Sequence, residues 1–86
     1  MSTLAEKLLR SLALIWPGST SVAAIARNVE LPREHVSKAI WELREARLAV
    51  RLNFRTVALT SDGVFAARDR FDDVRERFPV CEGGAL

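Results

Sequence analysis

The sequence has little cysteine and no long hydrophobic run. Cys81 is the only cysteine among 86 residues, and one thiol can form neither an internal disulfide nor a cysteine-cluster zinc site. The longest uninterrupted apolar run is the five residues from Leu12 to Trp16. This run is far shorter than the ~20 residues of a membrane-spanning helix and is short for the apolar part of a signal peptide. These features predict a cytoplasmic protein with no membrane segment.

Residues that support catalysis or metal binding are also scarce. His35 is the only histidine, and the four glycines do not form a phosphate-binding loop. The aspartates between residues 69 and 73 interleave with the arginines between 68 and 75, which is typical of a solvated helix surface with ion pairs. We therefore expect no enzymatic activity, no metal and no cofactor, and the sequence identifies no small-molecule effector.

Length and composition predict one small globular domain. Hydrophobic residues make up 49% and charged residues 28% of the chain, which excludes a disordered protein. We expect the domain to span residues 1–80 and residues 81–86 to form a flexible tail. Residues 1–60 carry nine Lys and Arg against five acids, whereas residues 61–86 carry four Arg against six acids. This split predicts a basic working surface in the first part of the chain.

Hydrophobic spacing predicts three helices in the first half. Apolar residues recur every three or four positions over 3–16, 21–28 and 32–47, which is the period of an amphipathic helix. Pro17 and the glycine after it end the first helix. Pro32 is suited to the first turn of the third helix, because its missing N–H has no partner there in any case.

The period changes to two over residues 49–60. Val50 and Leu52 alternate with polar residues, and Val57 and Leu59 alternate with Thr56, Ala58 and Thr60. This period indicates two strands that are half exposed to water, with one face turned inward. The pattern predicts a hairpin whose tip lies at residues 53–55.

A final helix is predicted over residues 61–78, capped by Thr60 or Ser61. Its apolar stripe and the surplus apolar residues of the first helix could pack on each other within the chain. We expect instead that they pair across a two-fold axis in a homodimer. The candidates for a dimer interface are Leu8, Leu12, Trp16, Val64, Phe71, Val74 and Phe78.

Three helices, a hairpin and a further helix follow the order of a winged helix-turn-helix. Residues 22–48, VAAIARNVELPREHVSKAIWELREARL, resemble the helix-turn-helix of MarR-type and IclR-type transcription regulators of bacteria and archaea. Residues 59–63, LTSDG, resemble the Leu-Thr-x-x-Gly that follows the wing in MarR-like proteins. The resemblance implies a mainly α fold, with a three-helix bundle, a two-stranded β wing and a C-terminal helix. It also implies transcription regulation through binding to double-stranded DNA.

Two positions depart from the pattern of these regulators. Glu30 stands at a turn position that is often glycine, and Arg47 stands where a glycine usually precedes the wing. A residue other than glycine costs about 1 kcal/mol in a backbone with positive φ. We therefore expect the turn to be shaped differently here.

The resemblance places the DNA-reading positions on the third helix, and a helical wheel independently turns Glu34, Lys38 and Trp41 outward. The wing tip and the start of the second helix supply further groups for phosphate or the minor groove. The candidate DNA-binding residues are Thr20, Ser21, Arg27, Arg33, Glu34, His35, Ser37, Lys38, Trp41, Asn53 and Arg55.

Each of these assignments has a plainer alternative. Glu34 with Lys38, and Lys38 with Glu42, are i,i+4 pairs that any solvated helix can carry. Trp41 could pack under the wing, meet a second copy or another protein, or stack on nucleic acid. A winged helix that serves as a protein-interaction module, without sequence-specific DNA binding, is the alternative function.

Overall fold

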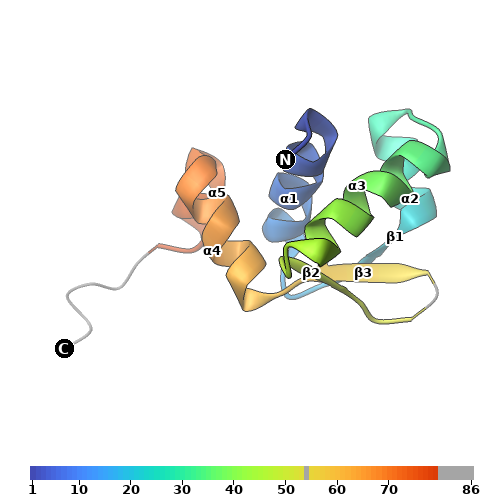
Figure 1. Cartoon of the computed structure of the whole chain (residues 1–86). Helices are drawn as coiled ribbons and strands as arrows, with labels where there is room; N and C mark the ends of the chain where they lie inside the picture. The colour runs from blue at the N-terminus through green and yellow to red at the C-terminus, as the bar shows by residue number, and fades with distance from the viewer. Residues whose placement is uncertain (54, 80–86) are drawn as a thin grey trace.

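The computed structural model describes residues 1–53 and 55–79, so the predicted tail and Cys81 lie outside the described residues. Figure 1 shows a mainly helical chain with a small sheet. Its elements are α1 (Thr3–Ile15), β1 (Thr20–Ser21), α2 (Val22–Val29), α3 (Arg33–Glu45), β2 (Ala49–Arg51), β3 (Thr56–Leu59), α4 (Ser61–Arg70) and α5 (Asp72–Arg77).

Helix α1 is the centre of the fold. It lies between α4 and α5 on one side and α2 and α3 on the other, above the sheet (Figure 1). Leu8, Leu9 and Leu12 of α1 are fully buried together with Val36 and Leu43 of α3. Their burial supplies most of the driving force that holds α3 in place. None of the helices in the described part of the chain has the length and hydropathy needed to cross a bilayer.

Hydroxyl side chains set the starts of three helices. The hydroxyl oxygens of Ser2, Ser21 and Thr60 accept hydrogen bonds from backbone N–H groups three residues ahead, at 3.0–3.1 Å. These bonds satisfy donors that the first turn of a helix leaves free. The predicted bounds agree with the observed ones to within one residue for α1 and α2. Helix α3 begins after Pro32 and ends at Glu45, two residues before its predicted end.

The sheet has three antiparallel strands in the order β1-β3-β2. Thr20 of β1 pairs with Val57, and Ala49 of β2 pairs with Leu59. Strand β1 was not predicted, because two residues are too few to show a period.

The prediction that Val50 and Leu52 of the wing point inward was wrong. Val50 and Leu52 are 42% and 57% exposed, whereas Ala49 is only 3% exposed. Alternate residues of a strand share a face, so Arg51 lies on the same face as Ala49. The strand is therefore one residue out of phase with the prediction. In β3, Ala58 is buried as well as its neighbours Val57 and Leu59, so this strand does not alternate between buried and exposed residues.

The predicted helix over 61–78 is two helices. Phe71 separates α4 from α5 and has an extended backbone, with φ −127° and ψ 124°. The break turns α5 toward α1, where Val74 is fully buried and the Arg10 guanidinium pairs with the Asp73 carboxylate. The Arg75 guanidinium stabilises the bend between α4 and α5. It donates hydrogen bonds to the backbone carbonyls of Arg68 and Asp69 and to the Asp72 carboxylate.

Most of the residues predicted for a dimer interface are buried in the core of the single chain. Leu8, Leu12, Val64 and Val74 are buried in the core, so the structure leaves their side chains no surface for a partner. Phe71, Trp16 and Phe78 are half-buried against this core. The rings of Trp16 and Phe78 meet edge to face, with centroids 5.7 Å apart.

The two turns that lack glycine adopt the left-handed conformation nevertheless. Glu30 has φ 57° and Arg47 has φ 64°. Our expectation of a different turn shape was therefore wrong. The chain keeps the geometry that glycine would favour and accepts a cost of about 1 kcal/mol at each position.

Candidate nucleic-acid interface

Helix α3 is anchored by one face and presents the opposite face to solvent. Val36, Ile40 and Leu43 are buried against α1 and the sheet. Lys38 and Trp41 are exposed on the outer side, as the helical wheel predicted. Such anchoring is what a helix needs if its free face is to enter the major groove.

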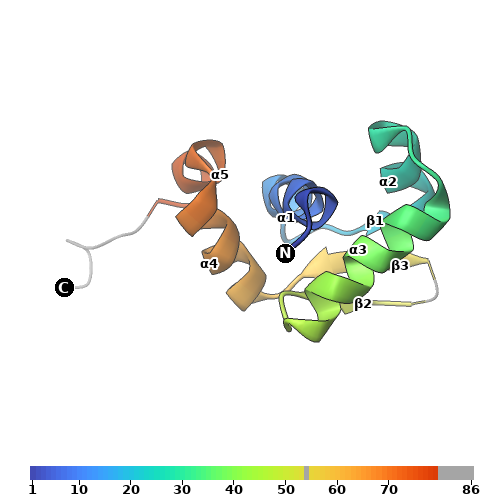
Figure 2. The ribbon, with the colours of Figure 1, turned by 45° about the horizontal axis from the view of Figure 1, so that its top comes forward.

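A basic groove lies between α2, α3 and the wing. It has a volume of about 620 Å³. Arg33 of α3, Arg51 of β2 and Arg55 of the wing tip line this groove, and no acidic residue does. Figure 2 shows how the hairpin extends beside α3 toward the end of the molecule where α2 lies. The lining residues are Ser21, Val22, Ala23, Arg33, Ser37, Arg51 and Arg55.

Backbone hydrogen bonds hold the wing tip against α2. The N–H of Val22 donates to the carbonyl of Arg55 at 3.1 Å. The side-chain oxygen of Asn53 accepts from the N–H groups of Arg55 and Thr56, at 2.8 and 3.1 Å. Arg55 is thus positioned from both sides. The Asn53 side chain therefore stabilises the turn of the wing through its amide oxygen.

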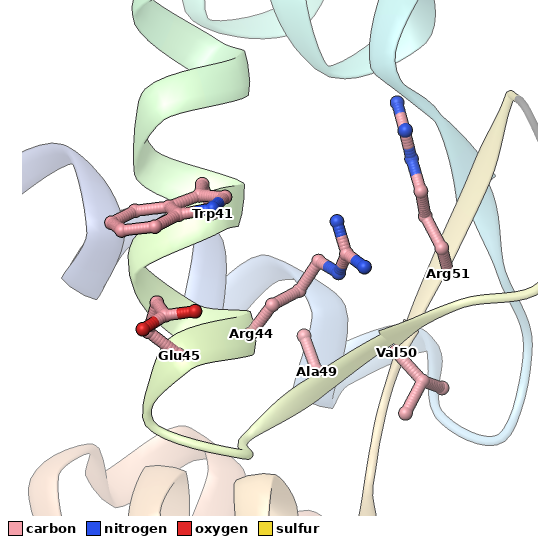
Figure 3. Close-up of a pocket in the computed structure, with 6 residues that line it drawn as sticks. All are labelled: Trp41, Arg44, Glu45, Ala49, Val50 and Arg51. Atoms are coloured by element: carbon pink, nitrogen blue, oxygen red, sulfur yellow. The ribbon is translucent and has the colours of Figure 1, made fainter.

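A second pocket continues the groove along α3. It has a volume of about 380 Å³ and lies between the last turns of α3 and strand β2. Figure 3 shows Arg44 and Arg51 extending into the space between α3 and the wing. Arg51 lines both pockets, so they form one face. We call this face the α3–wing face. It carries four arginines and one acid, and it is lined by Ser21, Val22, Ala23, Arg33, Ser37, Trp41, Arg44, Glu45, Ala49, Val50, Arg51 and Arg55.

The cations of the α3–wing face have no acidic partners within residues 1–53 and 55–79. The i,i+4 pairs considered for Lys38 are not formed there either. Glu42 instead accepts a hydrogen bond from the backbone N–H of Ser2 at 2.8 Å, which lowers the pKa of its carboxyl group. The ion pairs between side chains lie elsewhere, on α1, α4 and α5. The positive charge of the α3–wing face is therefore available to an anion.

The structure brings together only part of the predicted DNA-binding set. Ser21, Arg33, Ser37 and Arg55 line the basic groove, and Trp41 lines the second pocket. The others lie outside both pockets: Thr20 is half-buried beside α1, while Arg27, Glu34, His35, Lys38 and Asn53 are exposed.

Sequence reasoning missed Arg44 and Arg51. Arg51 was not among the predicted residues, because it stands between Val50 and Leu52, which were expected to point inward. Arg44 is seven residues after Ser37, which places it on the same side of the helix, and this spacing could have identified it. Packing under the wing, one alternative for Trp41, is excluded, because this side chain is 60% exposed.

No metal site is visible in the described residues, since they contain no group of three or more histidine, cysteine, aspartate or glutamate side chains with suitable positions.

Comparison with solved structures identifies the fold. ZitR of Lactococcus lactis, a zinc-responsive MarR family member, is 22% identical, with a TM-score of 0.68 over 90% of this chain and 55% of its own. NadR, solved with 4-hydroxyphenylacetate, is 22% identical, with a TM-score of 0.74 over 99% of this chain and 64% of its own. MepR from S. aureus is 17% identical, with a TM-score of 0.72 over 99% of this chain and 69% of its own.

The chain spans about half the length of three of the ZitR chains that it matches, at 54–55%. No protein-family model matches the sequence, and no curated protein matches it either. The structural likenesses confirm the predicted fold class: this chain has the winged-helix fold of the MarR-family structures.

Proposed function

We propose that the protein is a DNA-binding transcription regulator that inserts α3 into the major groove. The observation that supports this most strongly is the basic groove, in which Arg33, Arg51 and Arg55 converge from α3, β2 and the wing tip without an acidic neighbour. Guanidinium groups bind phosphate with two parallel hydrogen bonds. The likeness to MarR-family structures adds that this fold is used by regulators.

The residues divide into two roles. Lys38, with its ammonium on the outer face of α3, reads guanine, and Ser37 contacts a base edge or a phosphate. Arg55, held at the wing tip, contacts phosphate or enters the minor groove. Ser21 caps α2 with its hydroxyl oxygen, and its hydroxyl hydrogen remains able to donate to a phosphate.

Phosphate contacts are also proposed for Thr20 and Arg27, at the two ends of the β1–α2 segment. Such a regulator acts where the genome lies, which is the cytoplasm in a bacterial or archaeal cell.

We further propose a homodimer. One apolar surface that remains after folding lies around an open pocket of about 460 Å³, with Trp16, Phe65 and Phe78 among its walls. Phe65 is 60% exposed. A two-fold dimer spaces its recognition helices about 34 Å apart and predicts a palindromic site. Sedimentation that shows only monomers at tens of micromolar would contradict this arrangement.

A salt titration tests DNA binding directly. If about five phosphates are neutralised, the logarithm of the affinity for random duplex falls with the logarithm of the salt concentration, at a slope of about −4 to −5. The alternative, a protein-interaction module, predicts no binding at low salt, or binding that does not depend on salt.

A further inference from the structure

Trp41 is the large apolar residue on the free face of α3. Within residues 1–53 and 55–79, Trp41 remains 60% exposed. Figure 3 shows it on the surface of α3, one turn before Glu45. Exposure of an indole to water is unfavourable, so a ligand that covers this ring gains the free energy of its burial.

The surroundings of Trp41 favour nucleic acid over a protein partner. Besides Trp41, its pocket is lined by the charged side chains of Arg44, Glu45 and Arg51 and by the small apolar residues Ala49 and Val50. The exposed Lys38 lies one turn before Trp41. Lysine and glutamate, such as Lys38 and Glu45, are depleted at protein interfaces relative to the rest of the surface. DNA has the opposite arrangement, with phosphates along the edges of the groove and bases at its floor.

The floor of the major groove carries one kind of apolar group. Adenine, guanine and cytosine present hydrogen-bond donors and acceptors there, and thymine adds its C5-methyl group. An indole offers apolar area and a single N–H donor. Of the groups available, the thymine methyl is therefore the one that an indole matches best.

We propose that Trp41 determines specificity by contacting the C5-methyl group of a thymine, while Arg44 and Arg51 bind phosphates beside that base. This proposal rests on the proposed function, because it requires α3 to lie in the major groove. It also defines the ligand chemically: a pyrimidine with a methyl group at C5, so 5-methylcytosine offers the same contact.

The test compares duplexes that differ by one methyl group. A duplex is selected from a random pool by the full chain, and each thymine is then replaced in turn by deoxyuridine. We expect one or two positions at which the wild-type affinity falls roughly fourfold, the effect of one buried methyl group. At these positions Trp41→Ala binds the thymine and deoxyuridine duplexes equally, whereas Trp41→Phe keeps part of the difference.

Phe65→Ala is the matched control. Phe65 is exposed to the same extent as Trp41 but lies on α4, outside the α3–wing face. This variant keeps the discrimination between thymine and deoxyuridine, even if dimer formation and overall affinity change. Circular dichroism checks that each variant folds; we expect folding because both side chains are exposed.

Two outcomes separate this proposal from the proposed function. Salt-dependent duplex binding in which Trp41→Ala keeps the full response to deoxyuridine, or in which no position responds, overturns the role of Trp41 alone. If no duplex is retained from the pool at low salt, the proposed function fails and the role of Trp41 fails with it.

Discussion

Gly63, in the first turn of α4, lies directly against the backbone carbonyl of Leu48, at the entry to the wing. A β-carbon at position 63 would lie 2.1 Å from the carbonyl oxygen of Leu48, which is far too close for a carbon and an oxygen that are not bonded to each other. Thr60 strengthens the same junction, because its hydroxyl donates to the carbonyl of Arg47 and accepts from the N–H of Gly63, both at 3.0 Å. The Leu-Thr-x-x-Gly pattern thus joins both ends of the wing to α4.

Gly63→Ala should therefore destabilise the protein. Overpacking of this kind costs roughly 1–3 kcal/mol or more, and it outweighs the gain of up to about 1 kcal/mol from the helix propensity of alanine. Urea unfolding followed by circular dichroism measures the change. Asp62→Ala, at the exposed neighbouring position, is the control and should change the free energy of unfolding by less than the Gly63 variant. A fully stable Gly63→Ala variant would show that α4 can move away from the wing at little cost.

Arg47→Gly should stabilise the fold. Arg47 has φ 64°, and glycine removes a steric cost of about 1 kcal/mol, partly offset by the greater entropy of glycine in the unfolded chain. The matched control is Arg44→Gly, three residues earlier in α3, where glycine should destabilise by about 0.5–1 kcal/mol. Thermal unfolding should therefore show opposite signs for the two arginines. Equal destabilisation would mean that Arg47 contributes contacts that outweigh its strain.

The helices could be predicted because their signals are local. Apolar spacing and hydroxyl caps such as Ser21 and Thr60 depend on a few neighbouring residues, and these gave bounds within two residues for α1, α2 and α3. The break at Phe71 depends on what α5 meets after it turns, namely Arg10 and the core around α1. No spacing within residues 61–78 carries that information.

How much of the site could be predicted depended on which alternate residues of β2 point inward. A shift of one residue moves every side chain of a strand to the other face. Val50 and Leu52 look like core residues, yet the small Ala49 is the one that fits beneath α3. Sequence reasoning therefore found Arg33 and Arg55 but missed Arg51, whose place in the groove depends on how the strand packs against the helix.

Stability should fall in acid partly through Asp73. The hydrogen bond and charge of the Arg10 guanidinium lower the pKa of the Asp73 carboxyl group. A carboxyl group with a lowered pKa in the folded state contributes stability above its ordinary pKa of about 4, and this contribution is lost as the pH falls through the lowered value. Asp73→Asn should flatten the acid limb of the stability curve measured between pH 7 and pH 2. Asp69→Asn, which removes a carboxylate with no ion pair among the described residues, serves as the control. An unchanged acid limb in Asp73→Asn would show that the pair with Arg10 contributes nothing in solution.

Arg51→Ala should weaken binding to every duplex. Arg51 lines both pockets of the α3–wing face, so its loss removes about one phosphate contact and should reduce the magnitude of the salt slope by about 1. Arg70→Ala is the control, because Arg70 lies on α4, away from this face, and pairs with Glu6 of α1. An Arg51→Ala variant with an unchanged slope would place the DNA elsewhere.

Arg55 and Lys38 should separate affinity from sequence preference. Arg55 is held at the wing tip by its backbone, and we propose that its side chain contacts phosphate or the minor groove and does not read the bases that α3 contacts. Arg55→Ala should therefore reduce the affinity for all duplexes alike. Lys38 lies on the free face of α3, and loss of its contact with guanine should cost about 1–3 kcal/mol on the preferred sequence and little on random duplex. Selection from a random pool with each variant measures the two effects together. If Arg55→Ala changed the selected sequence and Lys38→Ala only weakened binding, the two roles would have to be exchanged, with the wing reading bases and α3 lying along the phosphate backbone.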